Sequence, residues 1–225
     1  MFISADPNFV SMAETDHRIA NNLSSLSGLI GLERKAISKT DKTFTTKQVC
    51  MLLDDINARI QVAAKLHKTL LTIEPRKELN LGRFLQQIAD MISKLHPEGM
   101  LVVTFDNSSE VCIDPGHALQ VGLITAELLT NAKKYAHPSG SPVKVHTRCE
   151  TKEDGSFVVE VTDDGVGLPH NFDPHKDGGV GFQVMRALAS GLNATLQFED
   201  RDPGVRARLV KPSAWPYLRP ARAAP

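Results

Sequence analysis

The stretch Phe157-Val-Val-Glu-Val-Thr-Asp-Asp-Gly-Val-Gly167 decides the fold of this chain. Its first six residues are rich in β-branched and aromatic side chains and predict a strand over 157–162. The acidic and glycine residues that follow are typical of a turn. They also suit an adenine pocket, because a carboxylate accepts from the exocyclic amine and glycines let the backbone approach the ring. Taken alone, the motif fits either interpretation.

A helix before this strand carries an acid, an amide and a lysine at helical spacing. Glu127, Asn131 and Lys134 are four and three residues apart, so they share one helix face. An amide oxygen is a hard ligand for Mg²⁺, and lysine offers a point charge to phosphate. A solvated polar face is the alternative interpretation.

Glycines precede the helix that follows the strand. Gly178-Gly179-Val180-Gly181 opens a predicted helix over 180–190. Free N–H groups and the positive dipole end at a helix N-terminus favour a bound anion. A flexible glycine hinge explains this stretch equally well.

Two long helical patterns come first in the chain. Asp6-Pro7 supplies an N-cap carboxylate and a proline at the first helical position, and this helix extends to about residue 38. A second pattern begins near Thr46. Both patterns repeat apolar residues four and three apart, namely Ile19, Leu23, Leu26 and Ile30, then Val49, Leu53, Ile56, Ile60, Ala63 and Leu70. We predict an antiparallel helical hairpin that forms a four-helix bundle in a homodimer.

The rest of the chain mixes helices with mostly neighbouring strands. Helices are expected over 81–92, 116–136 and 180–190, and strands over 101–105, 111–113, 143–148, 157–162, 194–198 and 205–210. This order predicts an α/β sandwich with helices on one face of a sheet. The expected fold class is α+β, with the hairpin at 7–75, the sandwich domain at 76–211 and a flexible tail at 212–225.

His17 lies on the first predicted helix but away from its apolar seam. At about 100° per residue it is roughly 200° from Ile19, so it is predicted to face water. Asn21, Ser24 and Gly28 share its stripe, which is small and polar. The imidazole is therefore accessible to another macromolecule.

Composition limits the partners. The 225 residues are 41% hydrophobic and 23% charged, with 26 basic and 26 acidic side chains. Zero formal net charge predicts no nucleic-acid partner, since such binders usually carry a basic excess. Three scattered cysteines fit a reducing compartment. Without a long apolar run or a basic-then-apolar leader, the chain is expected to be cytoplasmic and to have no membrane contact.

The order of these motifs resembles a known family. A polar helix, a strand ending in Asp-x-Gly-x-Gly and Gly-x-Gly opening a helix resemble the boxes of Bergerat-type ATPases across residues 79–210. The N-terminal region resembles the dimerisation and phosphoacceptor region of sensor histidine kinases. One subfamily, the HWE-like kinases, reads His-Arg-(Val/Ile)-x-Asn-Asn-Leu, met here by His17, Arg18, Ile19, Asn21, Asn22 and Leu23.

The resemblance implies a mechanism. The γ-phosphoryl group of ATP would move to His17 and then to an aspartate of a response-regulator receiver domain. Either Glu14 or Asp16 would orient the imidazole, and Glu127 would assist catalysis. Asn131 would hold Mg²⁺, and nucleotide contacts are implied for Asn131, Lys134, Tyr135, Asp163, Gly165, Gly167, Gly179 and Gly181.

The chain also departs from the family. Gly204-Val205 stands where Gly-Thr is usual, so a hydroxyl is absent, and the lid at 168–178 is short. Phe182 stands where leucine is common, and Tyr135 where histidine is common. The alternative function is a histidine phosphotransfer protein whose degenerate ATPase-like domain relays phosphoryl groups without ATP. A Bergerat-fold ATPase of another type is a third hypothesis, which the N-terminal hairpin disfavours.

Overall fold

The computed structural model describes residues 45–71, 79–107, 111–153, 156–174 and 176–212, with positions 27, 28, 30, 31, 34 and 38. The chain divides into two compact units, residues 1–77 and 78–225. The few described positions between 27 and 38 are helical, in agreement with the predicted first helix. Most of that helix, and the predicted tail after residue 212, lie outside the described residues.

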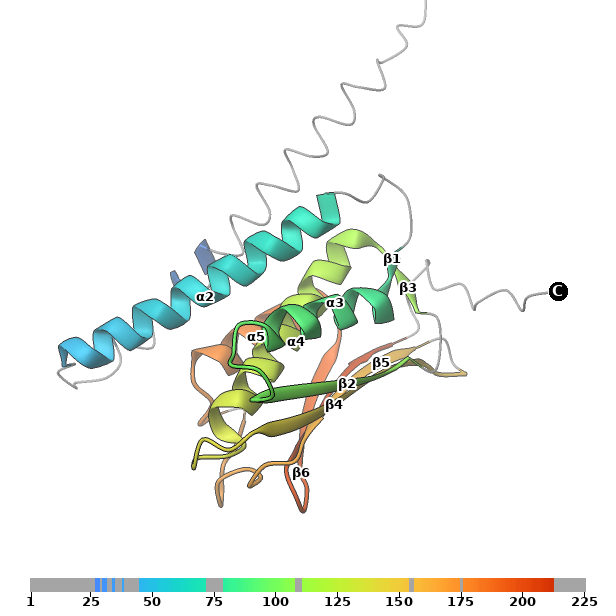
Figure 1. Cartoon of the computed structure of the whole chain (residues 1–225). Helices are drawn as coiled ribbons and strands as arrows, with labels where there is room; N and C mark the ends of the chain where they lie inside the picture. The colour runs from blue at the N-terminus through green and yellow to red at the C-terminus, as the bar shows by residue number, and fades with distance from the viewer. Residues whose placement is uncertain are drawn as a thin grey trace, which may run out of the picture. The chain divides into compact units, whose positions relative to one another are not determined.

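The N-terminal unit contains helix α2 (Thr46–Leu71) (Figure 1). The Thr45 backbone N–H donates to Gln48 Oε1 at 2.9 Å, and the Gln48 N–H donates to Thr45 Oγ1 at 3.3 Å. This reciprocal capping box fixes the start of the helix where the sequence predicts it. Val49 and Leu53, both on the predicted apolar stripe, are 41% and 58% exposed. The stripe therefore reaches the surface near the start of α2.

The C-terminal unit is built on a five-stranded sheet. Its strand order is β2-β4-β5-β7-β6, and its bounds are β2 (Leu101–Asn107), β4 (Val143–Thr151), β5 (Phe157–Asp163), β6 (Thr195–Asp200) and β7 (Val205–Lys211). Only β2 and β4 pair in parallel; the other neighbours are antiparallel. Helices α3 (Leu81–Ser93), α4 (Pro115–Tyr135) and α5 (Val180–Gly191) cover one face of the sheet (Figure 1). The predicted α+β class is confirmed.

The core lies between the helices and this sheet face. Strand β4 alternates as expected, with Val143, Val145, Thr147 and Cys149 buried and the residues between them more exposed. Burial raises the pKa of the Cys149 thiol to about 12, with a smaller contribution from the charge of Glu150. This cysteine is therefore an inert part of the core.

Helix α4 crosses the middle of this core. It begins at Pro115, and Asp114 Oδ1 accepts the Gly116 backbone N–H at 2.7 Å. Residues 121–129 of α4 are all buried, so this helix is apolar around nearly its whole circumference there. Its last turn, by contrast, reaches the surface, and the candidate residues of α4 extend from the buried stretch into that turn.

A second, two-stranded sheet was not expected. Strand β1 (Leu79–Asn80) pairs antiparallel with β3 (Cys112–Ile113). The predicted 111–113 strand is thereby confirmed, but the two residues of β1 are too few to show an alternating pattern. Asn80 also caps α3, because its Oδ1 accepts the Arg83 N–H at 3.0 Å.

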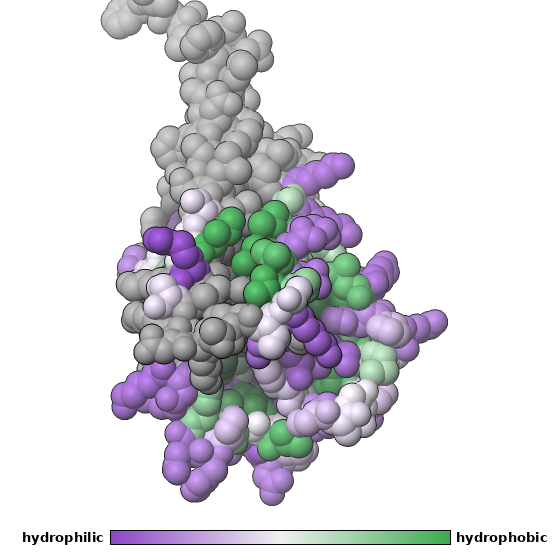
Figure 2. Space-filling view, turned by 90° about the vertical axis from the view of Figure 1, so that its left-hand side faces the viewer, coloured by the Kyte–Doolittle hydropathy of each residue, from purple (hydrophilic) through white to green (hydrophobic). Residues whose placement is uncertain are grey.

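The described surface mixes polar and apolar side chains. Figure 2 shows apolar patches surrounded by hydrophilic side chains on one face. The exposed large hydrophobic residues of the C-terminal unit include Leu95, Val102, Tyr135 and Val166. Among the described helices, none combines the length and apolarity needed to cross a membrane.

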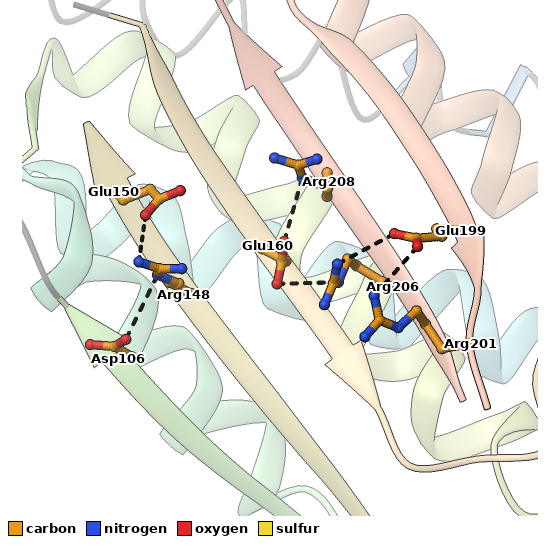
Figure 3. A network of polar contacts seen from close by, with 8 residues as sticks. All are labelled: Asp106, Arg148, Glu150, Glu160, Glu199, Arg201, Arg206 and Arg208. Atoms are coloured by element: carbon orange, nitrogen blue, oxygen red, sulfur yellow. Dashed lines mark hydrogen bonds and ion pairs between the residues drawn. The ribbon is translucent and has the colours of Figure 1, made fainter. Parts of the chain in front are cut away.

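The sheet face opposite the helices carries a row of alternating charges (Figure 3). Strand register places Asp106 beside Arg148, Arg148 beside Glu160, and Glu160 beside Arg208. Glu160 is the centre of this row, since its carboxylate lies 3.4 Å from both Arg206 Nε and Arg208 Nε. Opposite charges on neighbouring strands stabilise the pairing of the strands.

Replacing Glu160 with alanine should therefore destabilise the sheet. Its side chain is 19% exposed, and its removal leaves two partly buried guanidinium groups without this partner. We expect the free energy of unfolding to fall by about 1–2 kcal/mol in urea denaturation. Glu199→Ala is the matched control: that side chain is 53% exposed, and its loss should cost about 0.5 kcal/mol or less. Equal losses in the two variants would contradict the central role of Glu160.

Candidate functional site

The turn at residues 163–167, called here the 163–167 turn, follows β5 directly. Asp163 Oδ1 accepts two backbone N–H groups, from Gly165 at 2.9 Å and from Val205 at 3.2 Å. Burial raises the pKa of Asp163, and the charge of Asp164 adds to this effect. The two N–H bonds and His137 act in the opposite direction but do not cancel it. Asp163 is thus a partly desolvated carboxylate held in one orientation.

The raised pKa of Asp163 predicts a gain in stability for Asp163→Asn. A carboxyl whose pKa is raised on folding stabilises the fold most below its ordinary pKa of 3.8 and loses that contribution as pH rises through the folded value. An asparagine oxygen still accepts both N–H groups but carries no charge. We expect a small rise in melting temperature at pH 7 that shrinks towards pH 3. A variant that is less stable at pH 7 would contradict this.

The end of helix α4 is fixed against one side of this turn. The Val166 N–H donates to the Ala136 carbonyl oxygen at 2.9 Å. A Cβ at position 165 would overlap the backbone of Ala136, so only glycine allows this approach. His137 Nε2 lies 3.1 Å from Asp164 Oδ1. The structure therefore brings the last turn of α4 beside the 163–167 turn, as the candidate site requires.

The other side of the turn is held by β6 and by the β6–β7 connection. Asp200 Oδ1 accepts the Leu168 N–H at 2.9 Å. Gly167 has a φ of 82°, and a Cβ there would collide with the Asp200 carboxylate. Gly204, with a φ of 89°, lies directly against the Asp163 backbone. The turn is therefore clamped from three separate elements.

The polar residues of α4 differ in burial along the helix. Glu127 is 8% exposed, so the solvated-face interpretation does not hold at this position. Asn131 Nδ2 is buried and, among the described atoms, has no hydrogen-bond partner. Lys134 is exposed, and Tyr135 is 66% exposed. The face thus runs from a buried acid to an exposed cation across two turns of helix.

The predicted lid, residues 168–178, is held by an aromatic cluster. The Phe182 ring centroid lies 5.6 Å from that of Phe172 in the lid and 5.0 Å from that of Phe198 in β6. Arg186 of α5 also donates to the Pro174 carbonyl oxygen. Phenylalanine at 182, a departure from the family pattern, thus links the lid to the sheet.

Helix α5 begins directly after the second glycine of the predicted motif. Gly179 is its N-cap, and no side chain caps the first N–H groups. A Cβ at Gly179 would meet nothing within 4 Å, whereas Gly181 is buried. Open space beside uncapped N–H groups at a helix N-terminus suits an anion.

Other parts of the candidate site remain predictions. His17, Glu14 and Asp16 lie outside the described residues. Within the described part of the chain, no three His, Cys, Asp or Glu residues are grouped as a metal site would require.

Sequence reasoning missed the residues that hold the turn. The sequence predicts no role for Asp164, His137 or Asp200, and each forms a hydrogen bond across 20 or more positions in the chain. A pattern of local spacing contains no information on such contacts. The only signal was the pair of aspartates, of which one alone was assigned.

Comparisons with known proteins match both parts of the chain to described families. Residues 14–96 match the HisKA_2 family, described as histidine kinase. Residues 116–214 match the family described as histidine kinase-, DNA gyrase B-, and HSP90-like ATPase. The fold and these matches thus define an ATPase domain of this type, which follows a histidine kinase phosphotransfer region along the sequence. The chain belongs to the histidine kinases with a HisKA_2 region.

Individual relatives are histidine kinases as well. Blue-light-activated histidine kinase 2 of Erythrobacter litoralis is 25% identical over 189 residues, covering 82% of this chain and 52% of that protein. The sensor histidine kinase PdtaS of Mycobacterium tuberculosis is 24% identical over 192 residues, covering 84% and 36%. The chain therefore spans about half or less of the length of these relatives.

Solved structures share the fold. The blue-light activated histidine kinase EL346 of Erythrobacter litoralis aligns with a TM-score of 0.68 at 23% identity, over 95% of this chain and 62% of that one. The histidine kinase AdeS of Acinetobacter baumannii aligns with a TM-score of 0.53 at 15% identity, over 88% and 98%.

Proposed function

We propose that this chain transfers the γ-phosphoryl group of ATP to His17 and then to an aspartate of a response-regulator receiver domain. The observation that supports this best is the fixed contact between the end of α4 and the 163–167 turn. It joins the candidate phosphate and metal residues of α4 to the candidate adenine reader, Asp163, in one site.

Asp163 has the geometry of a base-reading carboxylate. Both backbone N–H groups use its Oδ1, so Oδ2 would accept from the exocyclic amine of adenine. Gly165 and Gly167 allow the close approach of Ala136 and Asp200, which holds the turn beside Asp163 in place. Gly179 and Gly181 would present the N-terminus of α5 to the phosphates.

The α4 face fits a magnesium–triphosphate group. Asn131 Nδ2 is buried and has no hydrogen-bond partner among the described atoms, which supports a ligand-binding role for this side chain. Asn131 Oδ1 is the hard oxygen that would hold Mg²⁺, with Glu127 beside it and Lys134 and Tyr135 nearer the solvent. When bound, the ion neutralises phosphate charge.

The acceptor would be a neutral imidazole nitrogen of His17. It attacks the γ-phosphorus, the bond to the β,γ-bridging oxygen breaks, and ADP leaves. Glu14 or Asp16 would accept the proton from the other ring nitrogen. The labile N–P bond suits onward transfer to a receiver carboxylate.

Two copies of the chain would form the functional unit. Val49 and Leu53 on α2 are exposed, and so is Ile30, at 46%, on the described part of the first helix. A four-helix bundle would bury such side chains and so favours a homodimer.

The direct test uses the whole chain with γ-labelled ATP and Mg²⁺. A protein-bound label that is stable in base and labile in acid is expected. Absence of label, together with uptake of phosphoryl from a phosphorylated receiver, would support the phosphotransfer alternative. An acid-stable label would contradict phosphohistidine.

A further inference from the structure

His137, which follows α4 and has no role in the proposed function, contacts the 163–167 turn of the candidate nucleotide site. His137 Nε2 lies 3.1 Å from Asp164 Oδ1. The same oxygen accepts the Lys144 backbone N–H at 2.9 Å. Asp164 therefore connects the segment after α4, the start of β4 and the 163–167 turn.

The direction of this hydrogen bond follows from the charge of Asp164. Burial alone would raise the pKa of Asp164, but the Lys144 N–H, the His137 hydrogen bond and the His137 charge together lower it. The carboxylate is thus ionised at neutral pH and can only accept. His137 must donate from Nε2. Its side chain is 24% exposed and that of Asp164 37%, so water screens the contact only in part.

This bond and a neighbouring backbone bond act on the same short segment. Ala136 accepts the Val166 N–H at 2.9 Å, and His137 holds Asp164 two residues earlier in the turn. Asp163 immediately precedes the residue that His137 holds. Asn131 lies little more than one helical turn before Ala136. The separation of Asp163 from Asn131 is therefore set at this junction.

We propose that His137 is a positioning residue for nucleotide binding: through Asp164 it fixes the 163–167 turn against the end of α4. The adenine-reading carboxylate and the phosphate-binding face of α4 then stand at the spacing that one nucleotide needs. This role rests on the proposed function, because it requires ATP in the site. His137 itself does not touch the nucleotide.

Two substitutions at His137 distinguish the effect of losing the hydrogen-bond donor from the effect of losing the aromatic ring. His137→Gln keeps an N–H near the position of Nε2, and His137→Phe keeps the ring but removes the donor. His146→Phe is the control, since His146 is an exposed histidine on the solvent-facing side of β4, and its Nδ1 lies 3.2 Å from Thr104 Oγ1. Each whole-chain variant is assayed for the Kd of Mg·ATP by calorimetry, for KM and kcat of autophosphorylation, and for melting temperature.

Loss of the hydrogen-bond donor should weaken the binding of ATP rather than slow the phosphoryl transfer. We expect His137→Phe to raise the Kd and KM for ATP about three- to tenfold, with kcat at saturating ATP nearly unchanged. His137→Gln should stay within about twofold of wild type, and His146→Phe should not differ from it.

Two results would overturn this role while leaving the proposed function intact. One is an unchanged Kd in His137→Phe, with or without a lower melting temperature, and the other is an equal loss of ATP affinity in the glutamine and phenylalanine variants. By contrast, a wild-type chain that binds no ATP would overturn the proposed function, and the role of His137 with it.

Discussion

Replacing His17 with glutamine should reduce acid-labile labelling from ATP to background. Glutamine retains polarity and similar length, but its amide nitrogen has no free lone pair with which to attack phosphorus. Because His17 is predicted to face water on its helix, the substitution should leave packing unchanged. Transfer of label to a receiver domain should disappear together with labelling of the chain.

The control for this experiment is nucleotide binding. The ATP site is predicted in the C-terminal unit, so His17→Gln should bind Mg·ATP with wild-type Kd in the same preparation. Asn131→Ala should show the opposite behaviour, with an intact His17 but weak binding and little label. Label that persists in His17→Gln would show that another side chain accepts the phosphoryl group, and the assignment of His17 would then be wrong.

The features that could be predicted from sequence are those with a local signal. The starts of the helices expected near residues 46 and 116 are examples, because the caps that fix them, Thr45 with Gln48 and Asp114 with Gly116, join residues no more than three positions apart. Strand β5 and the turn after it are contiguous, and the order of the glycine motifs identifies the superfamily without any knowledge of register. The α+β fold follows from these elements.

The contacts that shape the site could not be predicted, because they join distant segments. The effect of Val205 is an example. The sequence suggests that a polar contact is lost at this position, since valine lacks the hydroxyl of threonine. In the structure the Val205 backbone N–H holds Asp163 Oδ1 at 3.2 Å. Valine supplies that donor as well as threonine does, so this contact survives the substitution.

Phe182 is a second example of a residue whose contacts come from distant segments. The sequence shows only that it is larger than the leucine common in the family. Its value depends on Phe172 in the lid and Phe198 in β6, which lie 10 and 16 residues away in opposite directions. Three aromatic side chains from separate elements form one cluster that neither helical nor strand periodicity reveals.

Gly204→Ala should be among the most damaging single substitutions in the C-terminal unit. Gly204 has a φ of 89°, which L-residues rarely adopt, and its new Cβ would overlap the Asp163 carbonyl oxygen and lie 2.7 Å from the carbonyl carbon. Asp163 ends β5, which is paired along β7, so its backbone cannot retreat without loss of sheet hydrogen bonds. The same shift would move the Asp163 carboxylate away from the Val205 N–H.

Gly140→Ala separates the cost of backbone strain from the cost of the steric overlap of a new Cβ. Gly140 has a similar φ of 79°, but a Cβ there would meet nothing within 4 Å. It should cost only the backbone strain, about 1–2 kcal/mol, and leave ATP binding unchanged. Gly204→Ala should cost about 3 kcal/mol or more in urea denaturation, since overpacking adds to the strain, and it should abolish ATP binding. Equal destabilisation by the two alanines would show that β5 yields to the new methyl group, and the clamp on Asp163 would then be looser than its close contacts indicate.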